Sequence, residues 1–290
     1  MAQFVSSHGF EYGVKHFINL KSGYLLAIAA EALEKSEDEL NELLKLGAIY
    51  INNQRQNTNA LIPESQTIRV HTKPRRFFCD YIWKDRVVFE CEDFVVLDKP
   101  SGVPSHPSVD NIIDNSLEHL SRAISHPLFI THRLDTLTEG LIVYGKNINF
   151  VKGFNIKIQN RLVEKKYVAL VETNQVLPEK VIHYMEPSPR APKKVSAVAT
   201  EGWAFCELHI LNQKKAIDDT WVKIDLLTGR THQIRAQLSQ LLAPIKGDRL
   251  YGAKTKYGSG IALRACELRF TWNQKQQQFN LNEDFNTTTN

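Results

Sequence analysis

Apolar side chains recur every three or four residues between Tyr24 and Leu46, which is the spacing of one helix face. The pattern is interrupted at Ser36, and Glu39 follows three positions later. A serine and a glutamate at this spacing are typical of a helix N-terminal cap. We therefore expect two short helices, and Gly47 is a candidate for the residue that ends the second one.

An alternating pattern follows the second helix. The segment AIYINNQR alternates apolar and polar positions before an Asn-Asn turn, and LIPESQTIRVH supplies a partner strand. The polar, proline-containing stretch KPRR at 73–76 then interrupts the pattern. We expect a domain boundary there, with an N-terminal arm at 1–19, a small α+β domain at 20–75 and a main domain at 76–272.

Strand-forming and helix-forming segments are mixed in the main domain. RVVFECEDFVVLDKPSG holds two β-rich runs around an acidic turn, and helical spacing returns at 149–159 and 232–242. Further strands are expected in GLIVYG, KKYVALVE, WAFCELHI and TWVKIDLL. Their irregular order predicts the α+β class. The tail at 273–290 is polar and has few apolar anchors, so we expect it to be disordered.

Composition narrows the class of protein. Of the 290 residues, 42% are hydrophobic and 23% are charged, which is usual for globular proteins. The net charge of +4 permits a polyanionic partner without identifying one. The four scattered cysteines form no C-x-x-C pair, so we expect reduced thiols. No run approaches the ~20 apolar residues of a membrane span, so we expect a cytoplasmic protein without membrane contact.

The segment THRLDTLTEGLIVYG gathers polar residues directly before an apolar strand. Asp135 lies on the loop that leads into this strand, and such a place suits a carboxylate that a rigid sheet holds in position. The alternative is that Asp135 only caps a turn, through a side-chain bond to the amide of Leu137 or Thr138. The residues alone leave both interpretations open.

A second polar segment, LLTGRTHQIRAQL, combines a glycine turn with the start of a helix. Arg230 and Arg235 could bind phosphates or a carboxylate there, and an exposed helix face is the alternative. His132 and His232 have no Cys, Asp or Glu at metal-ligand spacing, so we assign no metal. The chain contains neither a G-x-x-x-x-G-K-[ST] loop nor a G-x-G-x-x-G turn, which makes a nucleotide-driven enzyme improbable.

Together these two segments resemble the motifs of the RluA-type RNA pseudouridine synthases, which act on ribosomal and transfer RNA. HRLDTLTEGL is similar to H-R-L-D-x-x-T-S-G-L, and LLTGRTHQIRAQL with PIKGDRLYG matches the later motifs in the expected order. KKYVALV resembles the strand between them. The resemblance spans 87–270 and implies a mixed, largely antiparallel central sheet with flanking helices and loops. It also implies rRNA or tRNA as the partner, no cofactor, and an intervening step of base flipping.

The resemblance assigns roles to individual residues. Asp135 corresponds to the catalytic aspartate, Tyr167 to the aromatic residue on the target base, and Arg235 to the arginine that pairs with the aspartate. An arginine partner would keep a buried carboxylate ionised. The Tyr167 hydroxyl could take part in proton removal at C5, although a core tyrosine is the alternative. Substrate contacts are expected at Arg133, which would fill the gap left by the flipped nucleotide, and at His132, Leu141, Arg230, Thr231, His232 and Gln233.

Three features depart from the family pattern. Glu139 stands where Ser or Thr is usual, and we expect its side chain to point away from Asp135 or to meet a basic residue. Gln237 replaces a histidine, and HYMEPSPRAPKKVS is an unusual segment. The region 20–75 resembles the small S4 RNA-binding domain, especially in KLGAIYINNQR, but its helices are acidic, so RNA contact and a packing role compete evenly.

The sequence therefore predicts a monomeric RNA-uridine isomerase. A catalytically silent RNA-binding or assembly factor with the same fold is one alternative. A hydrolytic N-glycosidase that releases uracil is another, because it would use a carboxylate beside a flipped nucleotide in the same way.

Overall fold

The computed structural model describes residues 2–6 and 10–282. The chain forms two compact units, one built from 1–79 and 106–119 and the other from 80–105 and 120–290. The boundary expected near residue 75 lies close to the end of the first segment. That residues 106–119 join the first unit was not expected, because this segment lies inside the predicted main domain along the chain.

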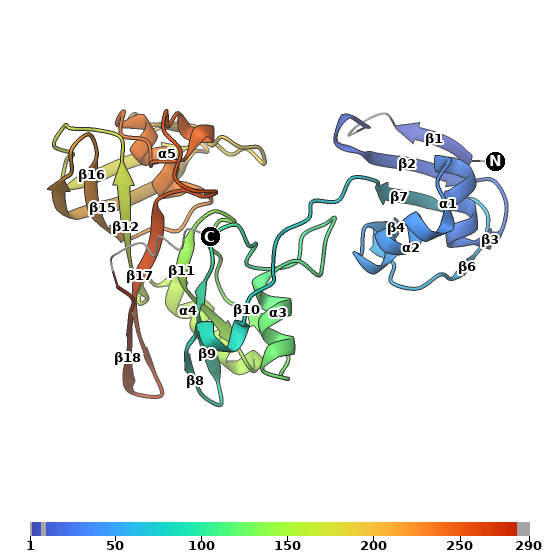
Figure 1. Cartoon of the computed structure of the whole chain (residues 1–290), viewed down its shortest axis with the longest axis horizontal. Coiled ribbons are helices and arrows are strands. Elements are labelled where there is room, and N and C mark those ends of the chain that lie inside the picture. The colour runs from blue at the N-terminus through green and yellow to red at the C-terminus, as the bar shows by residue number, and fades with distance from the viewer. Residues whose placement is uncertain (1, 7–9, 283–290) are drawn as a thin grey trace. The chain divides into compact units, whose positions relative to one another are not determined.

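The first unit packs two helices against a five-stranded antiparallel sheet of order β1-β2-β7-β4-β5, with a separate β3–β6 pair (Figure 1). The two expected helices are confirmed, and Ser36 and Glu39 form the expected capping box. Gly47 follows the second helix with φ +68°. The elements are β1 Ala2–Ser6, η1 Phe10–Tyr12, β2 Val14–Asn19, β3 Gly23–Tyr24, α1 Leu25–Leu33, α2 Glu37–Lys45, β4 Ile49–Ile51, β5 Gln54–Arg55, β6 Leu61–Ile62 and β7 Thr67–His71.

The expected N-terminal arm at 1–19 is wrong, because this segment supplies two strands of the first unit. β2 pairs with β7 from Val14↔His71 to Ile18↔Thr67, and Phe17 is buried in the core with Leu25. The partner strand lies some fifty residues later, so local patterning could not reveal the pairing. The resemblance of this unit to an S4 domain stays a prediction.

An ion pair ties the second segment of the first unit to the first. The Arg75 guanidinium donates to Asp110 Oδ1 at 2.8 Å and Oδ2 at 3.0 Å, and the Arg75 amide donates to the same carboxylate. Burial alone would raise the pKa of Asp110, but the bonds from Arg75 outweigh it and hold this pKa below its usual range. Ile113, from the same second segment, packs against the core that contains Phe17 and Leu25.

The second unit is built on an eleven-stranded sheet whose main order is β14-β13-β15-β16-β12-β17-β11-β9-β8. α4 lies beside β9 and β11, and α5 lies beside β15 (Figure 1). The mixed, largely antiparallel α+β class is confirmed. Its elements are η2 Trp83–Arg86, β8 Val87–Glu90, β9 Phe94–Lys99, β10 Phe129–Ile130, β11 Glu139–Gly145, α4 Ile148–Gln159, β12 Glu164–Val171, β13 Lys180–Met185, β14 Val195–Ser196, β15 Ala204–Lys215, β16 Thr220–Leu226, α5 Gln233–Gln240, η3 Arg249–Tyr251, β17 Leu263–Trp272 and β18 Lys275–Asn280, and α3 Ser116–Ala123 begins in the first unit and ends here.

The expected disordered tail at 273–290 is wrong for its first part. β18 forms an antiparallel hairpin with β17 around Asn273 and Gln274, both with positive φ (Figure 1). Phe279 is buried in the core of this unit with Phe94 and Phe270, which explains how a strand of mostly polar residues is held. Residues 283–290 lie outside the described residues. None of the described helices is both long enough and apolar enough to span a bilayer.

One parallel pairing joins the two halves of this large sheet. β11 meets β17 at Glu139↔Arg264 and Gly140↔Ala265, and the other strand pairs among the described residues of this sheet are antiparallel. Gly140 has φ +107°, and a Cβ placed on it would lie 2.8 Å from the Ala265 nitrogen and nearer still to its carbonyl oxygen. Only glycine fits there, because it has no Cβ and tolerates that φ.

The register at this crossing aligns four strands. Lys99 of β9 pairs with Gly140, Gly140 with Ala265, and Ala265 with Tyr167 of β12. The crossing lies five residues after Asp135 in the sequence. Strand β11, which follows the Asp135 loop, is therefore held on both sides by its neighbours in the sheet.

We predict that Gly140→Ala lowers the free energy of unfolding of the second unit by at least about 3 kcal/mol, because the added Cβ forces the two backbones apart. All four tryptophans lie in this unit, so tryptophan fluorescence during urea unfolding measures it selectively. Gly202→Ala is the matched control: Gly202 also has positive φ, but no atom lies within 4 Å of its Cβ position. Its cost should stay at about 1 kcal/mol. Equal losses for the two variants would contradict the proposed steric constraint.

Candidate active site

The loop before β11 leaves the Asp135 carboxylate free to meet another element. The turn is closed by the backbone, since the Asp135 carbonyl accepts from the Thr138 amide at 3.1 Å. Asp135 Oδ2 instead accepts from Arg235 Nη1 at 3.2 Å, across 100 residues of sequence. About 20% of the Asp135 side chain is exposed, so the carboxylate is accessible from one side.

Arg235 is a buried guanidinium held by two carboxylates. It lies in α5 with 4% of its surface exposed, and its Nε and Nη2 donate to Asp248 at 2.7 and 2.9 Å. Burial alone would lower the pKa of Arg235, but the bonds and charge of Asp248, together with Asp135, raise it. The arginine therefore stays charged and points its third nitrogen at Asp135.

Tyr167 lies in β12 near the same carboxylate and is 5% exposed. Burial first, and then the negative charge of Asp135, raise the pKa of this phenol far above its usual value. The hydroxyl is thus protonated at neutral pH and is a weak base. This argues against the expectation that the hydroxyl removes a proton at C5, and the expected contact of the ring with the target nucleobase stays a prediction.

Sequence reasoning gave no role to Lys99, a fully buried lysine at the end of β9. Its Nζ donates to the carbonyls of Pro100 at 2.9 Å, Val103 at 2.7 Å and Thr136 at 3.3 Å. Burial lowers the pKa of Lys99 to about 7, and the charge of Asp135 opposes this shift. The lysine thus anchors the residue that follows Asp135. The feature of the sequence that could have indicated this role is a lysine at the end of an apolar strand, in LDKPSG.

Asp248 and Tyr251 were also missed as individual residues, although PIKGDRLYG was noted as a motif. The Arg235 guanidinium lies 4.9 Å from the centre of the Tyr251 ring, and the Tyr251 hydroxyl lies 3.0 Å from His232 Nδ1. His232 Nε2 in turn lies 3.8 Å from Asp135 Oδ2. Both residues therefore belong to the shell around the Asp135–Arg235 pair.

Two of the expected substrate contacts, Leu141 and Gln233, are buried in the protein interior. Leu141 is 1% exposed and packs in the core with Phe94 and Val143, so its expected contact with the substrate stays a prediction that its burial does not favour. His132 is partly buried: its Nε2 accepts from the Val143 amide at 3.1 Å and its ring stacks on Phe154, so it supports β11 and α4.

Gln233 is a buried connector rather than an exposed contact. Its Oε1 accepts from the Thr228 hydroxyl at 2.9 Å and the Arg230 amide at 3.0 Å, while its Nε2 donates to Gln237 Oε1. Gln237 is fully buried, so the replacement of the histidine usual in the family alters the packing of the interior and not an exposed surface. Arg133, Arg230 and Thr231 are the expected contacts that lie exposed.

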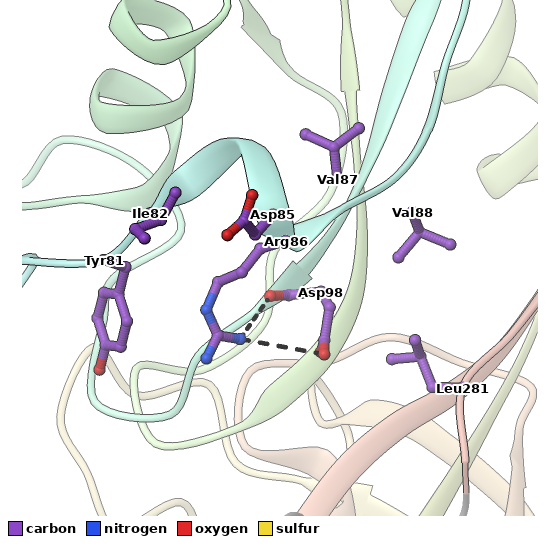
Figure 2. A pocket seen from close by; sticks show the side chains of 8 residues that line it. All are labelled: Tyr81, Ile82, Asp85, Arg86, Val87, Val88, Asp98 and Leu281. Carbon is purple, nitrogen blue, oxygen red and sulfur yellow. Dashed lines mark hydrogen bonds and ion pairs between the residues drawn. The ribbon is translucent and has the colours of Figure 1, made fainter.

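Glu139 meets a basic residue, as expected. Arg264 Nη1 donates to Glu139 Oε1 at 2.7 Å, and Arg264 Nη2 donates to Asp98 Oδ2 at 3.0 Å. Asp98 also borders a pocket of about 510 Å³, where Figure 2 shows Arg86 directed at Asp98. None of the expected site residues lines this pocket, whose other lining residues are Tyr81, Ile82, Asp85, Val87, Val88 and Leu281.

Comparisons with known proteins show which family this chain resembles. A family model described as RNA pseudouridylate synthase matches residues 93–240. The chloroplastic RNA pseudouridine synthase 6 of Arabidopsis thaliana is 37% identical over 67% of this chain and 46% of its own length. Ribosomal large subunit pseudouridine synthase C of Buchnera aphidicola is 27% identical over 84% of this chain and 83% of its own.

A solved structure shares the fold. Human RNA pseudouridylate synthase domain containing 1 superposes with a TM-score of 0.57 at 21% identity, over 70% of this chain and 85% of that one. The chain spans less than half the length of the two chloroplastic relatives that it matches, 46% and 44%.

We predict a pH-dependent stability term from His132. Burial first, and then the charge of Lys165, lower its pKa in the folded chain to about 3. As the pH falls below about 6.5, the unfolded chain takes up a proton that the folded chain refuses until about pH 3. Stability is thus unaffected above pH 6.5 and is lost below it, by at most about 1.4 kcal/mol per pH unit.

His132→Gln keeps an acceptor for the Val143 amide but does not titrate. Urea unfolding followed by tryptophan fluorescence should show the wild-type protein losing stability more steeply than this variant between pH 6.5 and 4. Measurements at pH 8 give the baseline difference between the two proteins. Parallel curves across this range would show that His132 is not the responsible group.

Proposed function

The chain belongs to the RNA pseudouridylate synthase family, and on that basis we propose that it isomerises uridine in RNA to pseudouridine with Asp135 as its catalytic residue. The observation that carries the proposal is the 3.2 Å contact between Asp135 and the buried Arg235. It places a partly exposed carboxylate at a fixed position beside a positive charge, which the chemistry requires.

The reaction breaks the C1′–N1 bond, turns the freed uracil and joins C1′ to C5. N1 gains a proton and C5 loses one, so no oxidant, reductant or cofactor is consumed. Asp135 would act either by attacking C1′ as a nucleophile or by removing the C2′ proton. Either role requires a charged carboxylate, and the fixed positive charge of Arg235 favours that form.

Tyr167 would hold the detached base during this rotation. Its ring offers an apolar face beside Asp135, and its protonated hydroxyl can form a hydrogen bond but is a poor base. The C5 proton is then better taken by a carboxylate or by water. The Tyr167 assignment therefore rests on stacking.

The target uridine must leave its stack before the reaction can begin. The exposed Arg133 lies two residues before Asp135 and has the length and charge to occupy the gap, and the exposed Arg230 can contact phosphate. We propose ribosomal or transfer RNA as the substrate. The name of the Buchnera aphidicola relative supports ribosomal RNA. A monomeric state and a cytoplasmic location stay predictions, and one of the relatives is chloroplastic by name.

We predict that Asp135→Asn abolishes catalysis while RNA affinity stays within about tenfold, because affinity comes mainly from Lys and Arg contacts to phosphates. Tritium release from RNA labelled at C5 of uridine measures turnover, and filter binding measures affinity on the same RNA. Asp218→Asn is the control, since it removes the same charge from an exposed turn of the same unit. It should behave as the wild-type protein does.

Other outcomes would favour the alternatives. Substantial tritium release by Asp135→Asn would contradict the role of this carboxylate. Wild-type protein that binds RNA without tritium release would support a silent binding factor. Abasic sites in place of pseudouridine would indicate an N-glycosidase.

A further inference from the structure

We propose that His232 is a positioning residue for Asp135: a neutral imidazole whose Nε2–H faces the carboxylate and whose tautomer is set by the Tyr251 hydroxyl. The proposal rests on the proposed function, and it gives His232 a role other than direct contact with the substrate. Four observations support it: the backbone at His232, the bonds of Tyr251, the distance to Asp135 and the surrounding charges.

The backbone holds the His232 ring rigidly. His232 is the N-terminal cap of α5 with φ +58° and ψ +21°, a left-handed conformation that is uncommon for a residue other than glycine. The turn before it is fixed by Gln233, which accepts from the Arg230 amide at 3.0 Å. Such strain persists only where the surroundings enforce it, and it points to a role for the side chain it aims.

The bonds of Tyr251 favour a proton on Nε2 of His232 over one on Nδ1. The Lys193 amide donates to the Tyr251 hydroxyl at 2.8 Å, so the hydroxyl has its own proton left to donate to His232 Nδ1 at 3.0 Å. Burial, the first of several causes, raises the pKa of Tyr251, which keeps this proton on the oxygen. With Nδ1 as the acceptor, a neutral His232 carries its proton on Nε2.

The other side of the ring agrees with this tautomer. His232 Nε2 lies 3.8 Å from Asp135 Oδ2. A lone pair on Nε2 would face a negative oxygen, whereas an N–H there is attracted to it. The separation is longer than a hydrogen bond, and catalytic bonds of this kind often tighten only when substrate is bound.

The ring is neutral at pH 7. Burial has the largest effect on the pKa of His232 and lowers it, and the charge of Arg235 lowers it further. Together they outweigh the charges of Asp135 and Asp248, which raise this pKa. A neutral donor can orient the carboxylate without cancelling its charge, so Asp135 stays reactive. The charged and titratable groups around this pair are Arg235, Asp248, Lys99, Tyr167, Tyr251 and Lys193.

Two substitutions at His232 distinguish the effect of the position of the N–H donor from an effect on folding. Asn tolerates the left-handed backbone best, but its amide reaches only to the Nδ1 position, whereas the Gln amide reaches the position of Nε2. We expect His232→Asn to fold normally and to lose roughly 10- to 100-fold in kcat, with KM within about threefold. His232→Gln should recover most of this loss. Single-turnover tritium release from C5-labelled RNA gives the rates.

Tyr251→Phe tests the origin of the tautomer. It keeps the ring beside Arg235 but removes the hydroxyl, so kcat should fall by roughly 3- to 10-fold. The double variant with His232→Asn should be no slower than His232→Asn alone, because Tyr251 acts through His232. Ser239→Ala removes a different bond, from the Ser239 hydroxyl to the Tyr251 carbonyl, and should leave kcat unchanged.

The pH profile adds a readout that a purely structural role would not move. Without the donor the ionised form of Asp135 is less favoured, so the acid limb of kcat should shift to higher pH in His232→Asn. Equal rates for the Asn and Gln variants, multiplicative losses in the double variant, or an unshifted profile would each overturn the proposal. Wild-type protein that releases no tritium would instead overturn the proposed function itself.

Discussion

A buried arginine between two aspartates is the interaction on which the candidate site depends. A guanidinium with 4% exposure is tolerable only if its charge is paired, and Asp248 supplies two of its bonds. This pairing fixes the plane of Arg235 and aims its remaining nitrogen at Asp135, which comes from a loop 100 residues earlier. Removing Asp248 would take away both of these bonds and leave the buried Arg235 charge poorly compensated, so the fold around α5 depends on this pair.

The sheet supplies the other half of this geometry. Gly140 lets β11 and β17 approach closely in their parallel pairing, and Lys99 holds the Thr136 carbonyl from the neighbouring strand. The chain directly after Asp135 is thereby tied to the sheet at Thr136 and Gly140. Tyr167 joins the same row of paired residues through Ala265, which brings an aromatic ring near the carboxylate. The order of these strands, and not any single loop, brings together residues distant in sequence.

Sequence predicted the parts of the molecule that are locally encoded. The helix cap at Ser36, the strands around GLIVYG and KKYVALVE, and the pairing of Glu139 with a basic residue could all be expected. Pairings set by distant segments could not, which is why β2 was taken for an arm and β18 for a disordered tail. Leu141 and His132 adjoin Asp135 in a motif, and a motif does not show which of its side chains pack against the sheet, as these two do. Asp248 was missed for the converse reason: its role exists only through contact with Arg235.

Mapping pseudouridines at nucleotide resolution in total RNA from cells with and without this gene tests the central claim most directly. Deletion should remove pseudouridine from one or a few sites, and wild-type protein should restore them. Arg235→Lys should fail to restore them at equal protein level, because lysine cannot bridge Asp135 and Asp248 as the guanidinium fork does. An unchanged pseudouridine map after deletion, or full restoration by Arg235→Lys, would contradict the account.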